Sequence, residues 1–388
     1  SSAASDVYKR QEFKDKAVKL TIGRRNKQYN DVADNDVAEE ILSRYGLDKE
    51  VEMTAVIHEN LVQFDITDWD FLLMRMDLLG LVCIVDDNKV TFKRPDFSSA
   101  SVLDVLYGST ILDYEATIDA RNQWQTVTAH AWNYSQQSVS EETANEPRIG
   151  QEAGDLSASV LNDVIGLDDY KLIHSGKLST VELISWADAR LQKQRLAKIQ
   201  GKVKIIGYPQ LKPDTYITLN GVGNRFNGPV YVSGVRHEFN AGVWETHVNF
   251  GMSTEWFAES LPYRSSNSNL GMLPTLNGLV IGIVTDLEDP EGEHRVRVKI
   301  PVLSSEGDGN WARIASLDAG GERGMFFRPE IGDEVIIGSI NNDASQLVIL
   351  GMLNSSQLAA PLTAANANDE KGYVSRSNMK WIFNDNEK

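Results

Sequence analysis

The chain has 388 residues and carries 55 acidic against 38 basic side chains, a net charge of −17. This length predicts two or three domains with a large core, and the ordinary share of apolar residues excludes a disordered chain. The negative charge argues against nucleic acid as a partner, because it would repel a phosphate backbone. A single cysteine, Cys83, excludes an internal disulfide framework, and its apolar neighbours favour a packed core thiol.

No apolar run approaches the roughly 20 residues that a membrane-spanning helix needs, and no signal peptide opens the chain. We therefore expect the protein to be made and held in the cytoplasm, with any export through other machinery. Residues 1–11 (SSAASDVYKRQ) have no periodicity. We expect them to be an unstructured leader that is not native.

The first folded segment mixes strands and helices. Residues 14–23 predict an opening strand, and Asp34, Asn35 and Asp36 offer N-caps for a helix that ends at Gly46. A strand is expected over residues 57–66.

A second helix, Phe71–Leu79, can be capped by the residues Thr67–Asp70 and ends at Gly80. Strands over residues 81–85 and 89–93 then predict a hairpin whose turn is Asp86–Asn88.

The middle of the chain is mostly β in pattern. Its expected strands cover residues 111–118, 126–132, 203–206, 216–219, 230–235 and 244–250. Residues 135–156 are polar and rich in Ser, Glu and Gly, which indicates a loop. The longest helix is expected over Ser179–Gly201, with Ser179 or Thr180 as the cap and Glu182 near the third position. Its apolar stripe includes Val181, Ile184, Ala187, Leu191 and Ile199.

The block Leu276–Asn354 predicts a compact five-stranded barrel. The segment Arg295–Ile300 alternates charged and apolar residues, which is typical of a strand with one buried face. By this alternation, the inward-facing set includes Val280, Val296, Val298, Val335, Ile337, Val348 and Leu350. The block holds thirteen acidic and six basic residues, a net charge of −7, which again disfavours nucleic acid.

This block resembles the oligosaccharide/oligonucleotide-binding (OB) barrel of the VgrG and phage-tail-spike family. The resemblance rests on an order of features: an apolar strand, an acidic Pro-Gly turn, the alternating strand, and the segments Trp311–Arg313, Pro329–Val335 and Leu350–Gly351. Further upstream, the passage Gln63–Leu81 is similar to a "Q-Y-x-E-S-D-x-x-F-L-x-R … G" passage of VgrG-type hubs. The segments that resemble the second hub barrel are Arg190–Gly201, Leu211–Pro213, Thr218–Gly221 and Val230–His237.

The resemblance implies a mainly β fold with a few helices: a hub of two β-barrel-like domains with a helical insertion, followed by the OB barrel. It places the hub at residues 12–260, with the insertion at about 34–95. A Ser/Asn-rich linker is expected at 261–275, the barrel at 276–354, and a neck with the start of a needle at 355–388. The first apolar residues of the needle are expected to be Tyr373, Val374, Trp381, Ile382 and Phe383. Both ends of the spike are expected to be truncated in this sequence.

In function, the resemblance implies a structural homotrimer of a contractile injection machine, either a type VI secretion system or a phage-tail-like particle. The trimer would link an Hcp-like tube protein and baseplate proteins to a PAAR-like tip protein and effectors. A target membrane would be met only by mechanical penetration. The protein would be cytoplasmic before firing and then secreted or delivered into the target cell.

A search for chemistry finds no motif for catalysis. The six histidines (58, 130, 174, 237, 247 and 294) lack metal-ligand spacing, and His237 and His247 favour a surface pair across a turn. The acidic residues 286–293 lack the order of a calcium loop. We expect no catalytic, cofactor-binding or metal-ligating residues, no cofactor, and no enzyme activity.

Two other functions stay open from the sequence. An OB barrel could bind glycan or peptidoglycan, which exposed aromatic residues on its second and third strands would favour. The alternating strand instead presents Arg295, Arg297 and Lys299. A cell-wall hydrolase within the hub is the third alternative.

Overall fold

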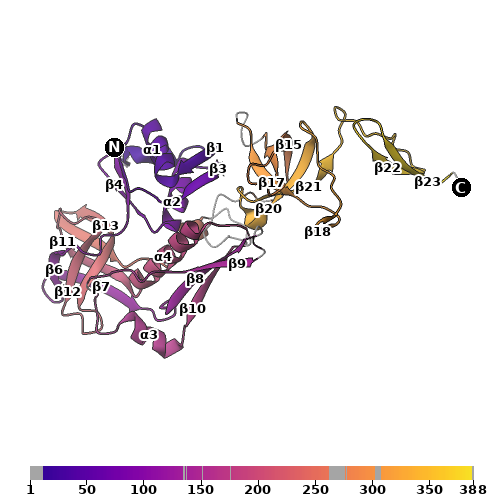
Figure 1. The fold of residues 1–388 in the computed structure, drawn as a ribbon. Helices are drawn as coiled ribbons and strands as arrows, with labels where there is room; N and C mark the ends of the chain where they lie inside the picture. The colour runs from indigo at the N-terminus through magenta and orange to yellow at the C-terminus, as the bar shows by residue number, and fades with distance from the viewer. Residues whose placement is uncertain are drawn as a thin grey trace, which may run out of the picture. The chain divides into compact units, whose positions relative to one another are not determined.

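The computed structural model describes residues 12–133, 136, 138–150, 152–174, 176–261, 276, 278–301 and 307–386. The chain is mainly β and forms two compact units (Figure 1). The first is Ser1–Asn277 together with Ser339–Gln346, and the second is Gly278–Gly338 together with Leu347–Lys388. The fold-class prediction is confirmed: strands dominate, helices are few, and a closed five-stranded barrel lies in the expected block.

The first unit opens with a helical part. Its elements are η1 (Lys16–Thr21), β1 (Arg25–Ala33), α1 (Asp34–Arg44), β2 (Asp48–Val51), β3 (Ile57–Ile66), α2 (Asp68–Leu78), β4 (Val82–Asp86) and β5 (Lys89–Lys93). Strands β1 and β3 pair antiparallel, and β2, β5 and β4 form a small sheet. The predicted β4–β5 hairpin is present. Asp87 and Asn88 adopt the positive φ angles of a tight hairpin turn.

Two local predictions here are wrong. Residues 16–21 form a 3₁₀ helix rather than a strand, because the Asp15 carboxylate accepts a hydrogen bond from the backbone N–H of Ala17 and caps it. The N-cap of α1 is Ala33, which has no side-chain cap bond, while Asp34 is buried inside the first turn. The cap of α2 is as predicted, since the Thr67 hydroxyl accepts from the N–H of Asp70.

The rest of the first unit is built on a six-stranded open sheet. Its strands, in spatial order, are β6 (Ser101–Leu106), β12 (Thr215–Asn220), β13 (Gly228–Asn240), β14 (Val243–Phe250), β11 (Ile199–Ile206) and β7 (Ile111–Ile118). A second sheet holds β10 (Asp169–His174), β8 (Thr126–Asn133) and β9 (Ser138–Thr143). The remaining elements are α3 (Ala158–Ile165), α4 (Thr180–Leu196) and η2 (Phe257–Ser260).

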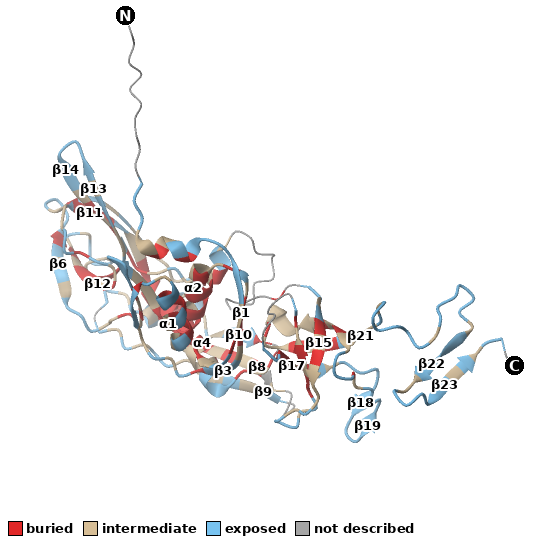
Figure 2. Ribbon diagram, turned by 90° about the horizontal axis from the view of Figure 1, so that it is seen from above, coloured by how far each residue is buried: buried red, intermediate tan, exposed pale blue. Residues whose placement is uncertain are grey.

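Helix α4 packs at the centre of this unit, where Figure 2 shows buried residues gathered on α1, α2 and α4. The predicted capping box is present: Ser179 Oγ accepts from the N–H of Glu182, whose carboxylate accepts from the N–H of Ser179. The predicted stripe is wrong in part, because Val181 is exposed and the second half of the helix is buried on every side.

The predicted end of this helix and the predicted loop are also wrong in part. The helix ends at Leu196, and Gly201 lies within β11, where a Cβ atom would be 2.1 Å from the carbonyl oxygen of Glu115. Glycine is therefore required by close strand approach rather than by a helix end. Residues 138–143 form β9, an edge strand whose polar residues face outward.

The second unit contains the closed barrel. Its strands, in order around the barrel, are β15 (Val280–Asp286), β16 (Val296–Lys299), β17 (Asn310–Ile314), β21 (Leu347–Leu353) and β20 (Glu334–Ser339). Its connections include β18 (Ala319–Gly320) and β19 (Arg323–Gly324), while η3 (Ile340–Asn342), between β20 and β21, belongs to the first unit. A separate hairpin follows, made of β22 (Glu370–Val374) and β23 (Lys380–Asn384).

Most of the predicted inward set is confirmed: Val296, Val298, Val335 and Ile337 are buried, and Val280 is half-buried. For β21 the prediction is wrong, because Leu347 and Ile349 are buried while Leu350 is half exposed. Strand β21 runs parallel to β17, where Leu347 lies beside the buried Ala312. Laterally paired residues share a face, which fixes the direction of both side chains.

The leader at residues 1–11 and nearly all of the linker at 261–275 lie outside the described residues. The division of the hub into two barrels with an insertion at about 34–95 stays a prediction. Among the helices that the structure describes, none is long and apolar enough to cross a membrane.

Candidate functional site

An apolar groove on the second unit is the main candidate for a functional surface. It has a volume of about 470 Å³. Its lining comes from the end of β17, the segments on either side of the β18–β19 hairpin, β21 and the β22–β23 hairpin: Ile314, Ala315, Ser316, Leu317, Met325, Phe327, Gly351, Met352, Lys371, Gly372, Tyr373, Trp381 and Phe383. Lys371 is the one charged residue in this lining. Such a surface suits packing against another apolar surface rather than acid–base chemistry.

The register of the terminal hairpin explains why its aromatic residues line the groove. Tyr373 lies directly opposite Trp381, and Lys371 lies opposite Phe383. Side chains alternate along a strand, so these four residues share one face, and the side chain of Ile382 lies on the other. The rings also contact each other: Trp381 and Phe383 have centroids 5.4 Å apart, and Tyr373 lies 4.9 Å from Phe327.

The aromatic face is left open to solvent. Trp381 is 62% exposed and Phe383 is 56% exposed, and Figure 2 shows both hairpin strands largely as exposed residues. Leu317, at 93%, is the most exposed of the large apolar residues in the groove. These values describe large apolar side chains that the described part of this single chain does not cover.

The sequence pointed to this hairpin as the start of a needle, naming Tyr373, Val374, Trp381, Ile382 and Phe383. Three of them (Tyr373, Trp381 and Phe383) are exposed, and Val374 and Ile382 are half-buried. The sequence analysis missed the contribution of the segment that follows β19. Its signal was Met325-Phe326-Phe327, an apolar run between two loops, of which Phe326 is 74% exposed.

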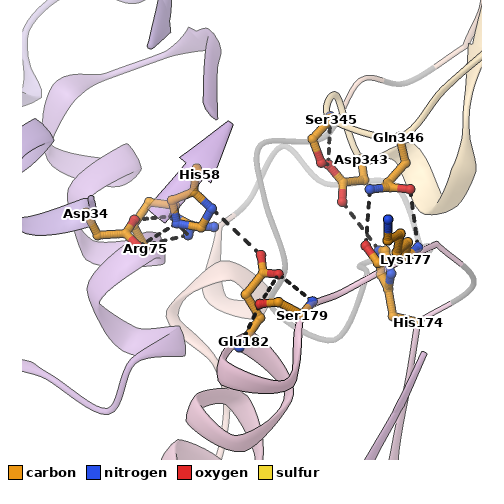
Figure 3. Close-up of polar contacts among 10 residues, drawn as sticks. All are labelled: Asp34, His58, Arg75, His174, Lys177, Ser179, Glu182, Asp343, Ser345 and Gln346. Atoms are coloured by element: carbon orange, nitrogen blue, oxygen red, sulfur yellow. Dashed lines mark hydrogen bonds and ion pairs between the residues drawn. The ribbon is translucent and has the colours of Figure 1, made fainter. Parts of the chain in front are cut away.

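A buried polar cluster in the first unit is the second feature of note (Figure 3). Arg75 on α2 forms two bonds with the Asp34 carboxylate, at 2.7 Å from Nε and 3.1 Å from Nη2. Nε2 of His58 lies 2.8 Å from Asp34 Oδ2. Burial alone would raise the pKa of Asp34, but Arg75 and His58 outweigh it and hold that pKa below its ordinary value. The cluster is therefore a structural ion pair.

Helix α4 extends this cluster and forms ion pairs with several other segments of the unit. At its N-terminus, Glu182 Oε1 lies 3.7 Å from His58 Nδ1. In and after its last turns, three cations bind acids from earlier segments: Lys193 with Asp77, Arg195 with Glu146, and Lys198 with Glu152. The three cations are almost fully buried, so these pairs satisfy charges that α4 carries into the core.

The histidines show no common site. His237 lies opposite Thr246, and His247 opposite Arg236, so the expected pairing of the two imidazoles across the turn is wrong. Their positions are adjacent in register, which sends the side chains to opposite faces of the hairpin. Among the described residues, no group of three or more His, Cys, Asp or Glu could hold a metal ion. The absence of catalytic and cofactor residues stays a prediction.

The acidic turn of the barrel is hydrogen-bonded to the start of the alternating strand. Asp289 accepts hydrogen bonds from the backbone, Nε and Nη2 of Arg295, and these bonds hold its pKa below the ordinary value. Trp311 on β17 lies beneath two guanidinium groups, with Arg295 at 5.8 Å and Arg297 at 5.9 Å from its ring centroid. The aromatic ring on the third strand is thus covered by two arginine side chains and is not an open face for a ligand.

Comparison with known proteins gives two family matches. Residues 7–241 match the family described as the Alg8 N-terminal domain. Residues 280–353 match the type VI secretion system/phage-baseplate injector OB domain. Together the two matches cover most of the chain.

The chain is also similar to solved structures at low identity. A component of the type VI secretion system of E. coli, the c3393 protein, is 15% identical with a TM-score of 0.49, over 87% of this chain and 76% of that one. The prophage MuSo2 43 kDa tail protein of Shewanella oneidensis is 12% identical with a TM-score of 0.44, over 61% and 72%. A tail protein of Neisseria meningitidis is 14% identical with a TM-score of 0.42, over 63% and 74%.

Proposed function

Because the chain belongs to the Alg8 N-terminal domain family and carries the injector OB domain of type VI secretion systems and phage baseplates, we propose that it is a trimeric, non-enzymatic spike subunit. The sequence-based assignment to the spike family is confirmed by the OB-domain match. The chain is a spike-like structural protein. The finer points, which are the trimer, its partners and its delivery, are the proposal.

The apolar groove of the second unit carries this proposal. Trp381 and Phe383 are ordered in a regular hairpin yet lie more than half exposed, and Leu317 is almost fully exposed. Contact between water and so much apolar surface is unfavourable. A second and a third copy of the chain would relieve this cost by packing against the groove. Three copies can cover one another around a common axis, which closes the assembly.

The proposed partners are those that the resemblance to the spike family implies. The trimer would sit on an Hcp-like tube protein within the baseplate, carry a PAAR-like tip protein and effectors, and meet the target membrane only mechanically. The protein would be cytoplasmic before firing and delivered by the apparatus. A closed barrel suits this work, because closure removes the sheet edges and distributes load over many backbone hydrogen bonds.

The glycan-binding alternative has less support than the spike. OB barrels that bind sugars or nucleotides use open aromatic faces. Here Trp311 is covered by Arg295 and Arg297, and the acidic turn is engaged with Arg295. A glycan pull-down tests this alternative, and a peptidoglycan zymogram tests the hydrolase alternative. We expect both to be negative.

The assembly surface is tested by single changes on the two faces of the terminal hairpin. Trp381→Ser removes an aromatic ring from the groove, and Lys380→Ser is the matched control on the adjacent, opposite face. We expect the wild-type chain and the control to associate toward trimers as concentration rises, and Trp381→Ser to associate less. Light scattering or sedimentation across a concentration series measures this.

A second arm of the experiment raises the effective concentration of the chains. A heterologous trimeric coiled coil joined after Lys388 holds three copies together, and the groove should then add to the thermal stability of the trimer. We expect Trp381→Ser, but not Lys380→Ser, to lower its melting temperature. Two results together would contradict the proposal that the groove is an assembly surface. They are equal melting temperatures for the two fused variants and no change in the association of the free chain with concentration.

A further inference from the structure

The connection between β20 and β21, Ser339–Gln346, belongs to the first compact unit although the strands on either side of it belong to the second. It is held by specific polar contacts. The Gln346 side-chain amide pairs with the backbone of Lys177 in both directions: the N–H of Lys177 donates to Oε1 at 3.3 Å, and Nε2 donates to the Lys177 carbonyl at 3.2 Å. This segment therefore has a defined binding position, called its seat below, on the loop that holds Gly176 and Lys177.

Gly176 is part of that seat. A Cβ atom at position 176 would lie 2.8 Å from Gln346 and 2.9 Å from His174, so any larger residue would displace one of them. The backbone bonds of the segment are equally specific, since the Leu276 N–H donates to the Asn342 carbonyl and the Ser339 hydroxyl donates to the Leu276 carbonyl at 2.8 Å.

One titratable pair lies at this seat. Nε2 of His174 is 3.4 Å from Asp343 Oδ2, which is ion-pair distance but not hydrogen-bond geometry. The imidazole is almost completely buried. The other carboxylate oxygen of Asp343 accepts from the N–H of Ser345 at 2.9 Å and from its hydroxyl at 2.7 Å. The carboxylate is thus oriented by its own segment, with one oxygen turned to His174 (Figure 3).

Nδ1 of His174 has a hydrogen-bond partner in the backbone of Gly176 whether the imidazole is neutral or protonated. The N–H of Gly176 donates to Nδ1 at 3.1 Å, so a neutral His174 carries its proton on Nε2. The Gly176 carbonyl oxygen lies 3.2 Å from the same Nδ1. A protonated ring can donate there while its Nε2–H faces Asp343. The site therefore accommodates both states, but only the cation forms an ion pair with the segment.

The other charged groups around this pair are those of the buried polar cluster. Glu182, at the start of α4, lies between the two histidines and acts on both by its charge. Asp34, Arg75 and His58 complete the set, and Lys177 extends from the loop that follows His174 (Figure 3). Three carboxylates (Asp34, Glu182 and Asp343) thus lie near the Arg75 guanidinium and the two imidazoles. Asp343 and Glu182 have a charged imidazole partner only when His174 and His58 are protonated.

We propose that His174 and Asp343 form a proton-operated lock, in which protonation of the imidazole tightens the hold on Ser339–Gln346 and loss of that proton loosens it. This inference does not depend on the proposed function. Burial acts to lower the pKa of His174, but Asp343, the Gly176 backbone and Glu182 together outweigh it, so the pKa is raised from 6.5. Burial acts to raise the pKa of Asp343, but His174 and Ser345 together outweigh it, so that pKa is lowered from 3.8.

The sign of the pH dependence follows from these directions. The contribution of His174 is complete below its ordinary pKa and is lost as pH rises through the raised one. The contribution of Asp343 is present above its ordinary pKa and is lost as pH falls through the lowered one. The lock is therefore tightest in mildly acidic medium, between those two limits, and opens toward alkaline pH.

Hydrogen exchange on the intact chain tests the lock. We expect backbone amides of residues 340–346 to be better protected at about pH 6 than at about pH 8.5, after correction for intrinsic rates, by roughly tenfold for each unit by which the imidazole pKa is raised. His174→Gln and Asp343→Asn should both abolish the difference. The second variant keeps an oxygen for Ser345 and removes only the charge.

His247→Gln is the matched control. It removes an imidazole that lies 3.5 Å from Glu238 on the six-stranded sheet, and it should leave the pH difference at residues 340–346 unchanged. Equal protection at both pH values, or a difference that persists in His174→Gln, would overturn the proposal. If that variant fails to fold, an NMR titration of His174 in the wild-type chain decides, since a pKa at or below 6.5 also refutes the lock.

Discussion

Replacing Val296 by Asp should destabilise the barrel by roughly 4 kcal/mol or more, because the change places an unpaired charge in an apolar interior. Val296 is fully buried on β16, where it lies beside the buried Ala312. Denaturant unfolding followed by circular dichroism or intrinsic tryptophan fluorescence measures the free energy of unfolding.

Leu350→Asp is the matched control for this change. It introduces the same carboxylate on β21 of the same barrel, but at a side chain that is half exposed. We expect a cost within about 1 kcal/mol, as for other surface changes. Similar losses for the two variants would show that the inward register of β21 has been assigned to the wrong residues.

Replacing Arg75 by Met should cost roughly 3–5 kcal/mol, because it leaves the Asp34 carboxylate buried without its cation. Arg75 supplies two hydrogen bonds to Asp34, and both side chains are nearly inaccessible to water. The double variant Asp34→Asn/Arg75→Met removes both charges and should recover much of the loss. A double variant no more stable than Arg75→Met would mean that packing of the Arg75 stem, rather than the charge, is what matters.

The Arg75→Met deficit should also depend on pH. In the wild-type chain the pKa of Asp34 is lowered, so its contribution is present above the ordinary value of 3.8 and disappears as pH falls through the lowered pKa. Without Arg75, the largest influence that lowers that pKa is lost, so Asp34 takes up a proton at higher pH than in the wild-type chain. The gap between variant and wild type should therefore narrow as pH is lowered from neutral toward 4, as chemical unfolding at several pH values would show.

Local signals in the sequence predicted a large part of the fold. The Ser179–Glu182 capping box, the Thr67 cap and the Asp87-Asn88 turn are formed by residues a few positions apart, so their chemistry can be recognised without the tertiary structure. Strict alternation likewise identified the buried residues of β16. Each of these features is decided within one element.

The errors occur where distant segments decide the outcome. Asp34 looks like a helix cap, but it is recruited by Arg75, 41 residues away. Strand β21 is apolar at four successive positions, so only its pairing with β17 determines which side is buried. The groove was predictable in part, because the terminal aromatics stand out in the sequence. Met325 and Phe327 come from a different connection and join them only in the folded unit.

The cations of α4 have a consequence for the order of folding. Asp77, Glu146 and Glu152 all precede the helix in the chain, and Lys193 is 116 residues from its partner. A ribosome therefore releases the three acids before the helix that neutralises them. Long sequence separations slow folding, because the chain between the partners must be closed into a loop first. The helical part and both segments that carry these acids can complete their packing only once α4 has been synthesised.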